Sequence, residues 1–217
     1  MFVPKMYREP SAQWIIELIR SNPLALLMTN GEDSEGPYGT HLPAIPDPLR
    51  PTEGLTDLAG MTLLCHMNRA NPQWKTLRPA MPAVLSFTGP HAYVSPTLYP
   101  FSPAAPTWNY TAAQVRGVID VISDAEQTLA VVRATARTLE ADFGAGWDES
   151  GSIDHFLRIL PGVGAFRFTI SRAEATFKLS QEQSDTTRDG VCRHFARGDS
   201  GRQREVAEYM SRLTRAE

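Results

Sequence analysis

Short apolar runs of strand length, separated by turn residues, recur along this chain and constrain its fold more than any other feature. Residues 24–29 and 61–66 are two such runs, and Asn30-Gly31 closes the first. Proline is frequent between residues 43 and 51 and forbids regular structure there. Further strands are predicted at residues 40–43, 83–87, 91–95 and 114–122, with a closing hairpin formed by 163–170 and 173–179.

Helices are predicted around these strands rather than between them. We expect helices at residues 9–21, 71–77, 124–143 and 153–160, and an arginine-rich helical tail over residues 185–217. The longest should face the core with Leu129, Val132, Ala136, Leu139 and Phe143. Six to eight short strands with peripheral helices predict a mainly β, α+β fold: an antiparallel barrel over residues 1–184 with the tail packed on the same domain.

The overall charge and hydropathy exclude several classes of protein. The 217 residues carry 21 basic against 24 acidic side chains, without the basic excess typical of a dedicated nucleic-acid binder. Apolar runs stay far below the roughly 18 residues that cross a bilayer, and residues 1–5 do not resemble an export leader. We therefore expect a cytoplasmic protein with no membrane partner. Cys65 and Cys192 are too few for a disulfide framework and are expected to be reduced, buried or half-buried thiols.

Polar and aromatic residues gather in four segments at predicted strand ends, residues 66–75, 89–96, 106–110 and 177–181. Clustering at strand ends suggests a shared ligand pocket, because buried polar side chains need partners. Capping and turn chemistry is the alternative explanation, and for any single segment it is the better one.

His66 ends an apolar strand and could offer its imidazole to a metal. The chain lacks the ligand spacing of a zinc or non-haem iron site, whereas haem requires only one protein ligand. His41, at another strand end, is the rival ligand, and a hydrogen-bonded core histidine is the alternative role for His66.

Other candidates could bind substrate or move protons. Arg69 and Lys75, close to a helix start, could hold a phosphate or carboxylate or be ordinary surface charges. His91 and Tyr93 are two residues apart on a strand, so they should share a face. Lys178 lies in an apolar strand, where a lowered pKa is conceivable.

Several motifs in register resemble the PaiB-like family of FMN-binding negative transcriptional regulators over nearly the whole chain. They are Phe2-Val-Pro-Lys5, Thr40-His-Leu-Pro43, His66-Met-x-Arg69-Ala-Asn-Pro-x-Trp74, Gly89-Pro-His-x-Tyr93-Val-Ser-Pro96, Pro106-Thr-Trp108-Asn-Tyr110 and Phe177-Lys-Leu-Ser-Gln181. The resemblance implies the split barrel of flavin-reductase-like proteins, a homodimer with its ligand at the subunit interface.

Within that family the chain is similar to the branch of haem-dependent piperazate synthases, which convert N5-hydroxy-L-ornithine to L-piperazic acid with loss of water. The similarity lies in Thr29-Asn-Gly31, Cys65-His-Met-Asn-Arg69, Pro103-Ala-Ala-Pro106, Phe143-Gly-Ala-Gly-Trp147-Asp-x-Ser-Gly-Ser152, Leu160-Pro-Gly-Val-Gly-Ala-Phe166 and Gly201-Arg-x-Arg204 leading to Met210. It implies haem b with His66 as the iron ligand, and it implies an N-N bond-forming enzyme.

These sequence arguments give two sets of site residues. The set expected to bind the cofactor is His66, Arg69, Trp74, Lys75 and Trp108; the set expected to catalyse is Tyr93, Lys178 and His91. Two alternatives stay open: an FMN-binding oxidoreductase or flavin sensor, and a repressor that contacts DNA through residues 185–217. The near-neutral charge and the absence of a helix-turn-helix pattern disfavour the repressor.

Overall fold

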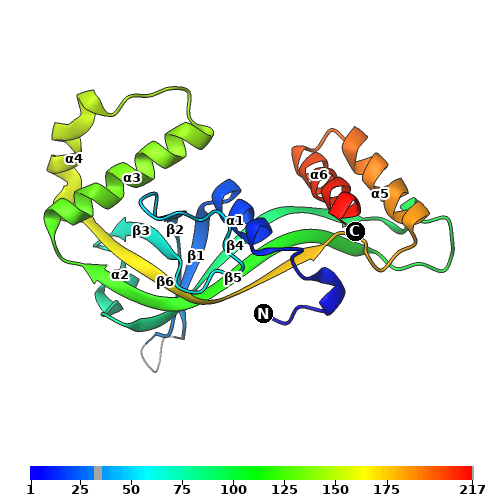
Figure 1. The fold of residues 1–217 in the computed structure, drawn as a ribbon, viewed down its shortest axis with the longest axis horizontal. Helices are drawn as coiled ribbons and strands as arrows, with labels where there is room; N and C mark the ends of the chain where they lie inside the picture. The colour runs from blue at the N-terminus through cyan, green and yellow to red at the C-terminus, as the bar shows by residue number, and fades with distance from the viewer. Residues whose placement is uncertain (32–35, 217) are drawn as a thin grey trace.

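The computed structural model describes residues 1–31 and 36–216, and it contains one closed barrel of six antiparallel strands. The expected polar turn at residues 32–35 and the last residue of the tail lie outside the described residues. The strand order around the barrel is β1-β2-β3-β6-β5-β4 (Figure 1). The antiparallel barrel is therefore confirmed; its strands are β1 (Leu24–Thr29), β2 (Tyr38–Pro46), β3 (Thr62–Asn68), β4 (Met81–Val94), β5 (Thr107–Ile122) and β6 (Val163–Lys178).

Three of the strands are much longer than predicted and leave the barrel together. β1 pairs with β4 only at residues 84–86, and β3 reaches no further along β6 than Thr169. Beyond those points β4, β5 and β6 continue as a three-stranded extension, residues 88–94, 107–115 and 173–178, which we call the arm. Figure 1 shows the arm running away from the barrel beneath α5 and α6.

Two predicted interruptions of these strands are wrong. Gly89-Pro90 does not break β4, because a register shift between Thr88 and His91 absorbs both residues. Glycine is needed there, since a Cβ on Gly89 would collide with the side chains of Leu18 and Thr111. The predicted hairpin of 163–170 and 173–179 is likewise one continuous strand with an irregularity opposite Arg116 and Gly117.

The barrel core is closed by helix α1 (Ala12–Ser21), which buries Trp14, Ile16 and Leu18. The Trp14 ring packs edge-on against Phe177 of the arm, with ring centroids 5.2 Å apart. Cys65 is buried and Cys192 half-buried, both reduced as expected, and burial raises the pKa of the Cys65 thiol.

Helix α3 (Ala125–Phe143) crosses the outer surface of β2, β3 and β6. Leu139 of its predicted inward face packs against the core, but the rest of that prediction is wrong. Its buried residues are Thr128, Val131 and Thr135, while Phe143 is exposed. The two threonines tolerate burial because their hydroxyls donate to the carbonyl oxygens of Asp124 and Val131. Hydrophobic periodicity could not anticipate this face.

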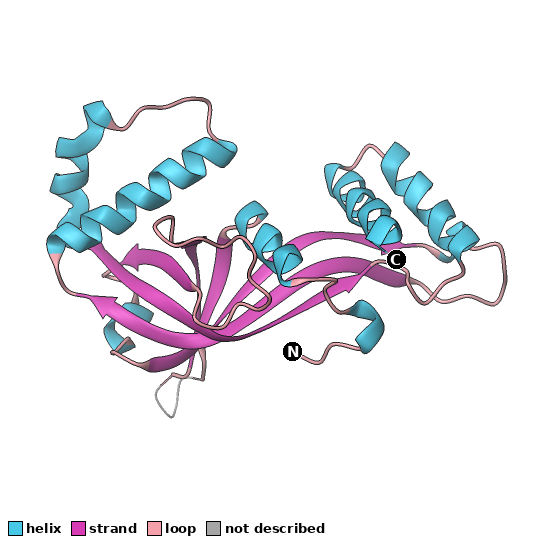
Figure 2. Cartoon of the chain, in the orientation of Figure 1, coloured by secondary structure: helices cyan, strands magenta, loops and turns pink. Residues whose placement is uncertain are grey.

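The remaining helices lie at the two ends of the molecule (Figure 2). Helix α4 (Ile153–Ile159) follows α3, and the short α2 (Pro72–Thr76) starts at the predicted cap, where the Asn71 side chain accepts from the Gln73 amide. The tail is helical as expected, as α5 (Asp185–Arg197) and α6 (Gly201–Ala216). Among the described residues no helix combines the length and apolarity needed to cross a membrane.

Candidate functional site

One face of the arm collects most of the predicted catalytic residues. His91, Tyr110 and Lys178 are direct register partners on β4, β5 and β6, and Tyr93 faces Trp108 in the next pair along. Directly opposed residues of neighbouring strands point to the same side, as do residues two apart. The expectation that His91 and Tyr93 share a face is confirmed, and the register adds Trp108, Tyr110 and Lys178 to it. We call this surface the arm face.

The arm face is aromatic and is left open within the protomer. Tyr93 is 49% and Trp108 50% exposed, although both lie in paired strands of the sheet. The Trp108 ring lies 5.5 Å from the His91 ring and 6.0 Å from the Tyr93 ring, centroid to centroid. Helices α5 and α6 cover the opposite face of the arm (Figure 2). Two half-exposed aromatic rings with a neighbouring imidazole can stack against a flat ligand.

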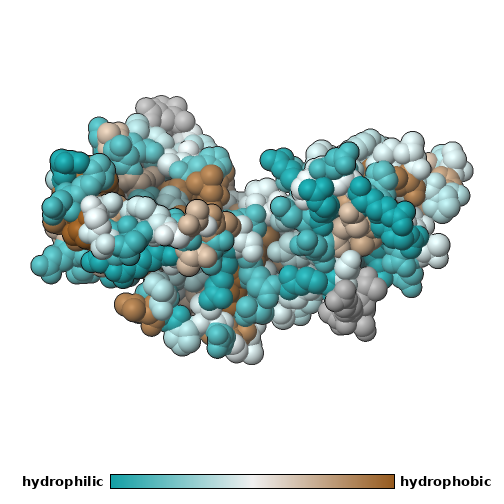
Figure 3. Space-filling model, turned by 90° about the horizontal axis from the view of Figure 1, so that it is seen from above, coloured by the Kyte–Doolittle hydropathy of each residue, from teal (hydrophilic) through white to brown (hydrophobic). Residues whose placement is uncertain are grey.

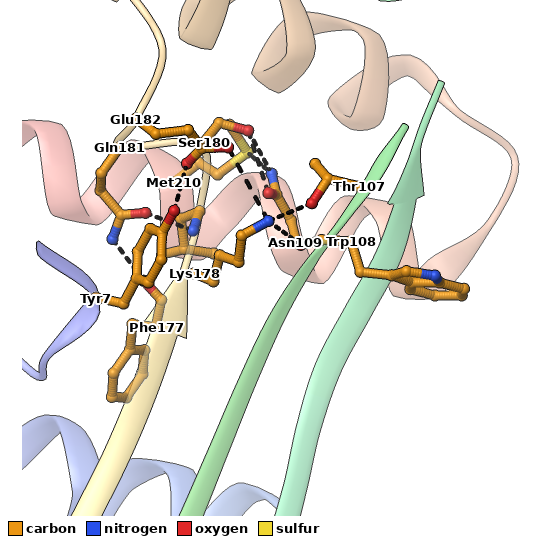
Figure 4. Close-up of polar contacts among 11 residues, drawn as sticks. Tyr7, Thr107, Trp108, Asn109, Phe177, Lys178, Ser180, Gln181, Glu182 and Met210 are labelled. Carbon is orange, nitrogen blue, oxygen red and sulfur yellow. Dashed lines mark hydrogen bonds and ion pairs between the residues drawn. The ribbon is translucent and has the colours of Figure 1, made fainter. Parts of the chain in front are cut away.

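The ammonium group of Lys178 is engaged by three partners at the edge of the arm face (Figure 4). It donates to the Thr107 hydroxyl and, at 3.0 Å, to the Trp108 carbonyl oxygen, and it lies 4.0 Å from a Glu182 carboxylate oxygen. An ammonium group has three N-H donors, and these three acceptors can engage all of them. The contacts hold the Lys178 ammonium in one position at the edge of the arm face.

Tyr7 completes this group from the N-terminal 3-10 turn. Its hydroxyl donates to Glu182 at 3.1 Å, and its ring lies 5.9 Å from the Lys178 ammonium nitrogen. Burial and the Glu182 carboxylate raise the pKa of Tyr7 to about 12. Sequence reasoning missed Tyr7, whose only signal is its place just after the Phe2-to-Lys5 motif.

A buried polar cluster holds the last strand in place behind the arm face. The Asn109 amide donates to the Ser180 hydroxyl at 2.9 Å and also contacts the Met210 sulfur of α6. Gln181 caps the strand end, because its amide oxygen accepts from the Leu179 N-H. The Ser180-Gln181 end of the Phe177-to-Gln181 motif is thus explained by structure, while Lys178 of the same motif lies on the arm face.

His66 lies elsewhere, in a pocket of about 510 Å³ on the outer surface of β2 and β3. The Nδ1 atom of His66 is buried and has no hydrogen-bond partner among the described residues. Burial lowers the pKa of His66, which keeps the imidazole neutral and its lone pair available. His41, the rival ligand, lines the same pocket and is exposed. The described residues contain no group of three or more side chains suited to hold a metal ion.

Of the other predicted cofactor residues, Arg69 and Trp74 lie beside this pocket and have structural partners, whereas Trp108 belongs to the arm face. Arg69 donates from Nε to the Val163 carbonyl at 2.8 Å, and its guanidinium lies 5.8 Å from the Trp74 ring. Trp74 packs on Gly164, where a Cβ would come within 2.5 Å of the indole. Lys75 is exposed and lines a neighbouring pocket of about 660 Å³ together with Arg78 and Asn30.

The predicted residues thus form two groups that do not meet within one chain. His66 is the register partner of Ala165 at the start of β6, whereas Lys178 ends the same strand. Thirteen residues of strand separate these positions, roughly 40 Å at the usual rise per residue. The spacing along β6 places the His66 pocket and the arm face at opposite ends of the protomer.

Comparison with known proteins gives a consistent family and fold. The model of the family FMN_bind_2, described as "Putative FMN-binding domain", matches residues 1–172. The chain is 25% identical to the protease synthase and sporulation protein PAI 2 of Bacillus subtilis, over 97% of this chain and 96% of that one. It is 28% identical to an uncharacterised protein of Emericella nidulans, over 90% of each chain.

Two solved structures share the fold at low sequence identity. The FAD and haem binding protein of Mycobacterium smegmatis superposes with a TM-score of 0.55 at 15% identity, covering 83% of this chain and 78% of that one. The flavocytochrome Anf3 of Azotobacter vinelandii gives 0.54 at 14% identity, covering 81% and 72%. At such identities the likeness concerns the fold, a split barrel with peripheral helices.

Proposed function

This chain belongs to the PaiB-like family of FMN-binding domains, and from that premise we propose that it binds FMN as a homodimer and acts as a flavin-dependent oxidoreductase. The observation that carries the proposal is the open arm face, where Trp108 and Tyr93 remain half-exposed beside His91. An isoalloxazine ring is flat and conjugated, and stacking against such rings would bury them.

A homodimer explains why the candidate residues lie in two distant groups. In a two-fold symmetric pair each surface patch is used twice, so the arm face of one protomer can complete the pocket region of its partner. We propose two composite sites per dimer, each with an arm face from one copy and the region of His66 and Lys75 from the other.

The side chains expected to bind the FMN phosphate are those of Lys75 and Arg78. Both line the pocket of about 660 Å³, and neither has an ion-pair partner among the described residues. A phosphate monoester carries nearly two negative charges at neutral pH, which two cations match. Arg69 is tied to Val163 and to Trp74, so it supports the pocket wall rather than the phosphate.

A second function, haem-dependent piperazate synthase, is favoured by one specific observation at His66. A neutral imidazole lining an open pocket, with no competing hydrogen bond from the described residues, is the donor that haem iron requires. His66 would hold haem b, which would supply Lewis-acid polarisation of the N-O bond of N5-hydroxy-L-ornithine.

In this second function the arm face would handle the substrate's protons and charge. Tyr93 and His91 are the groups able to donate a proton to the departing hydroxyl and to accept one from the attacking amine. Lys178, with its ammonium already engaged, would hold the substrate in place rather than take its proton.

Absorption spectra of the protein reconstituted separately with FMN and with haem distinguish the two functions. FMN binding with flavin bands and no haem uptake supports the first. A Soret band lost in His66→Ala, together with a product of N5-hydroxy-L-ornithine lighter by one water, supports the second.

Two control variants test whether His66, rather than another histidine, ligates the haem iron. His41→Ala tests the other imidazole of the same pocket, and His194→Ala removes an exposed imidazole on α5. We expect both to keep the wild-type spectrum. Loss of the Soret band in His41→Ala with retention in His66→Ala would make His41 the ligand, and uptake of neither cofactor would refute both functions.

The repressor alternative finds no support in the tail. Exposed residues from 185 to 213, in α5, α6 and their connection, include five arginines (193, 197, 202, 204, 212) and five carboxylates (185, 189, 199, 205, 208). Their charges cancel, although phosphate contacts dominate DNA affinity. Figure 3 shows mainly hydrophilic residues over these helices, with paler and apolar residues between them.

A further inference from the structure

Arg202 brings the C-terminal helices into contact with the arm face. It is the second residue of α6, in the part of the chain that follows the family match to residues 1–172. One of its terminal nitrogens lies 3.4 Å from Nε2 of His91, and the side chain is exposed. The tail therefore does more than cover the back of the arm.

The guanidinium of Arg202 has most of its hydrogen-bonding capacity unused. A guanidinium carries five N-H donors, and within the described part of the chain its one polar contact is the long one to His91. The two carboxylates closest to it in sequence, Asp199 and Glu205, form no ion pair with it there. The positive end of the α6 dipole adds to this uncompensated positive field.

We propose that Arg202 and His91 form a binding site for the carboxylate of a small-molecule substrate on the arm face. The Arg202 guanidinium, and an imidazole of His91 whose Nε2 carries the proton, can each donate to one oxygen of a carboxylate. Trp108, 5.5 Å from the His91 ring, would contact the apolar part of the same molecule.

A carboxylate fits this site better than the phosphate of a cofactor. Arg202 contributes one permanent charge, which matches a monoanion, whereas the pocket of Lys75 and Arg78 offers two. The assignment deepens the proposed function, since it names the substrate class handled on the arm face of the same composite site.

Acetate titration tests the site without reliance on any cofactor. The His91 ring resonances, assigned by their loss in His91→Gln, are followed by NMR in the full chain at constant ionic strength with chloride as reference. We expect a saturable shift for the wild type and for Arg193→Gln, an exposed α5 arginine with no polar contact among the described residues. Arg202→Gln should raise the apparent Kd about 10-fold or more. Absence of saturation in the wild type, or equal Kd values for both variants, would overturn the site.

A second comparison identifies the occupant. Binding of N5-hydroxy-L-ornithine should weaken about 10-fold in Arg202→Gln, while binding of its methyl ester changes less than about twofold. Weaker binding of FMN but not of riboflavin would overturn the substrate assignment and make this the cofactor phosphate site. If acetate behaves as expected while neither FMN nor haem is taken up, the proposed function fails and the carboxylate site stands.

Discussion

Burial of the His66 imidazole makes the free energy of unfolding depend on pH. Because burial lowers its pKa below about 6.5, the folded protein leaves His66 neutral where the unfolded chain is already protonated. The unfolded state then binds more protons, so the free energy of unfolding falls as the pH drops below that value.

Substitution of His66 should remove this dependence in the cofactor-free protein. We expect wild-type stability to decrease by up to about 1.4 kcal/mol per pH unit from this residue alone as the pH falls below about 6.5. The profile of His66→Gln should be flatter by that amount when unfolding is followed by urea titration at each pH. Parallel profiles for the two proteins would show that His66 is not the buried neutral group.

At the residue scale the sequence predicts local neighbours but not distant ones. The period of two along a strand correctly puts His91 and Tyr93 on one face. Trp108 and Lys178 lie on the same face because of the register of three strands, which the sequence does not reveal. Arg202 belongs to the Gly201-Arg-x-Arg204 motif, but its contact with His91 depends on how α6 packs on β4, which the motif does not indicate.

Among the elements, helix α2 is held by a contact that leaves no room for a methyl group. Gly164 on β6 faces the Trp74 indole, and a Cβ there would lie 2.5 to 2.6 Å from three ring atoms. Gly164→Ala should displace Trp74 and lower the free energy of unfolding by about 1–3 kcal/mol, as overpacking commonly does.

The matched control is Gly162→Ala, two residues away, where no atom lies within 4 Å of the added Cβ. Chemical denaturation should show little change for this variant. Equal stability of the two variants would mean that α2 can shift without cost. A large loss in Gly162→Ala alone would locate the constraint in the backbone of this turn.

The lengths of β4 and β6 show what sequence patterns miss about whole elements. Gly-Pro and Ser-Arg look like strand breaks locally, yet a register shift lets each strand continue. The buried face of α3, with its two threonines, is missed for a similar reason, because burial of a helix residue depends on the surface against which the helix packs. The antiparallel pattern needed only turn residues and apolar runs, and it was predicted correctly, although the eight predicted segments form six strands.

For the whole molecule, the separation of about 40 Å along β6 gives the most direct test of the dimer. A composite site needs His66 from one protomer and Trp108 from the other. His66→Ala and Trp108→Ala should each abolish cofactor binding, because each variant on its own lacks one of the two groups in every site. A mixed dimer then contains one site with both substitutions and one site with neither.

Co-refolding the two variants in equal amounts should therefore restore about a quarter of the wild-type sites, since random pairing makes half of the dimers mixed and each has one intact site. Cofactor absorbance per protomer measures this fraction directly. Refolding each variant alone is the control and should restore nothing. If the mixture binds no cofactor while size-exclusion chromatography shows mixed dimers, the site lies within one chain. The position of His66 and the arm face at opposite ends of the protomer then needs another explanation.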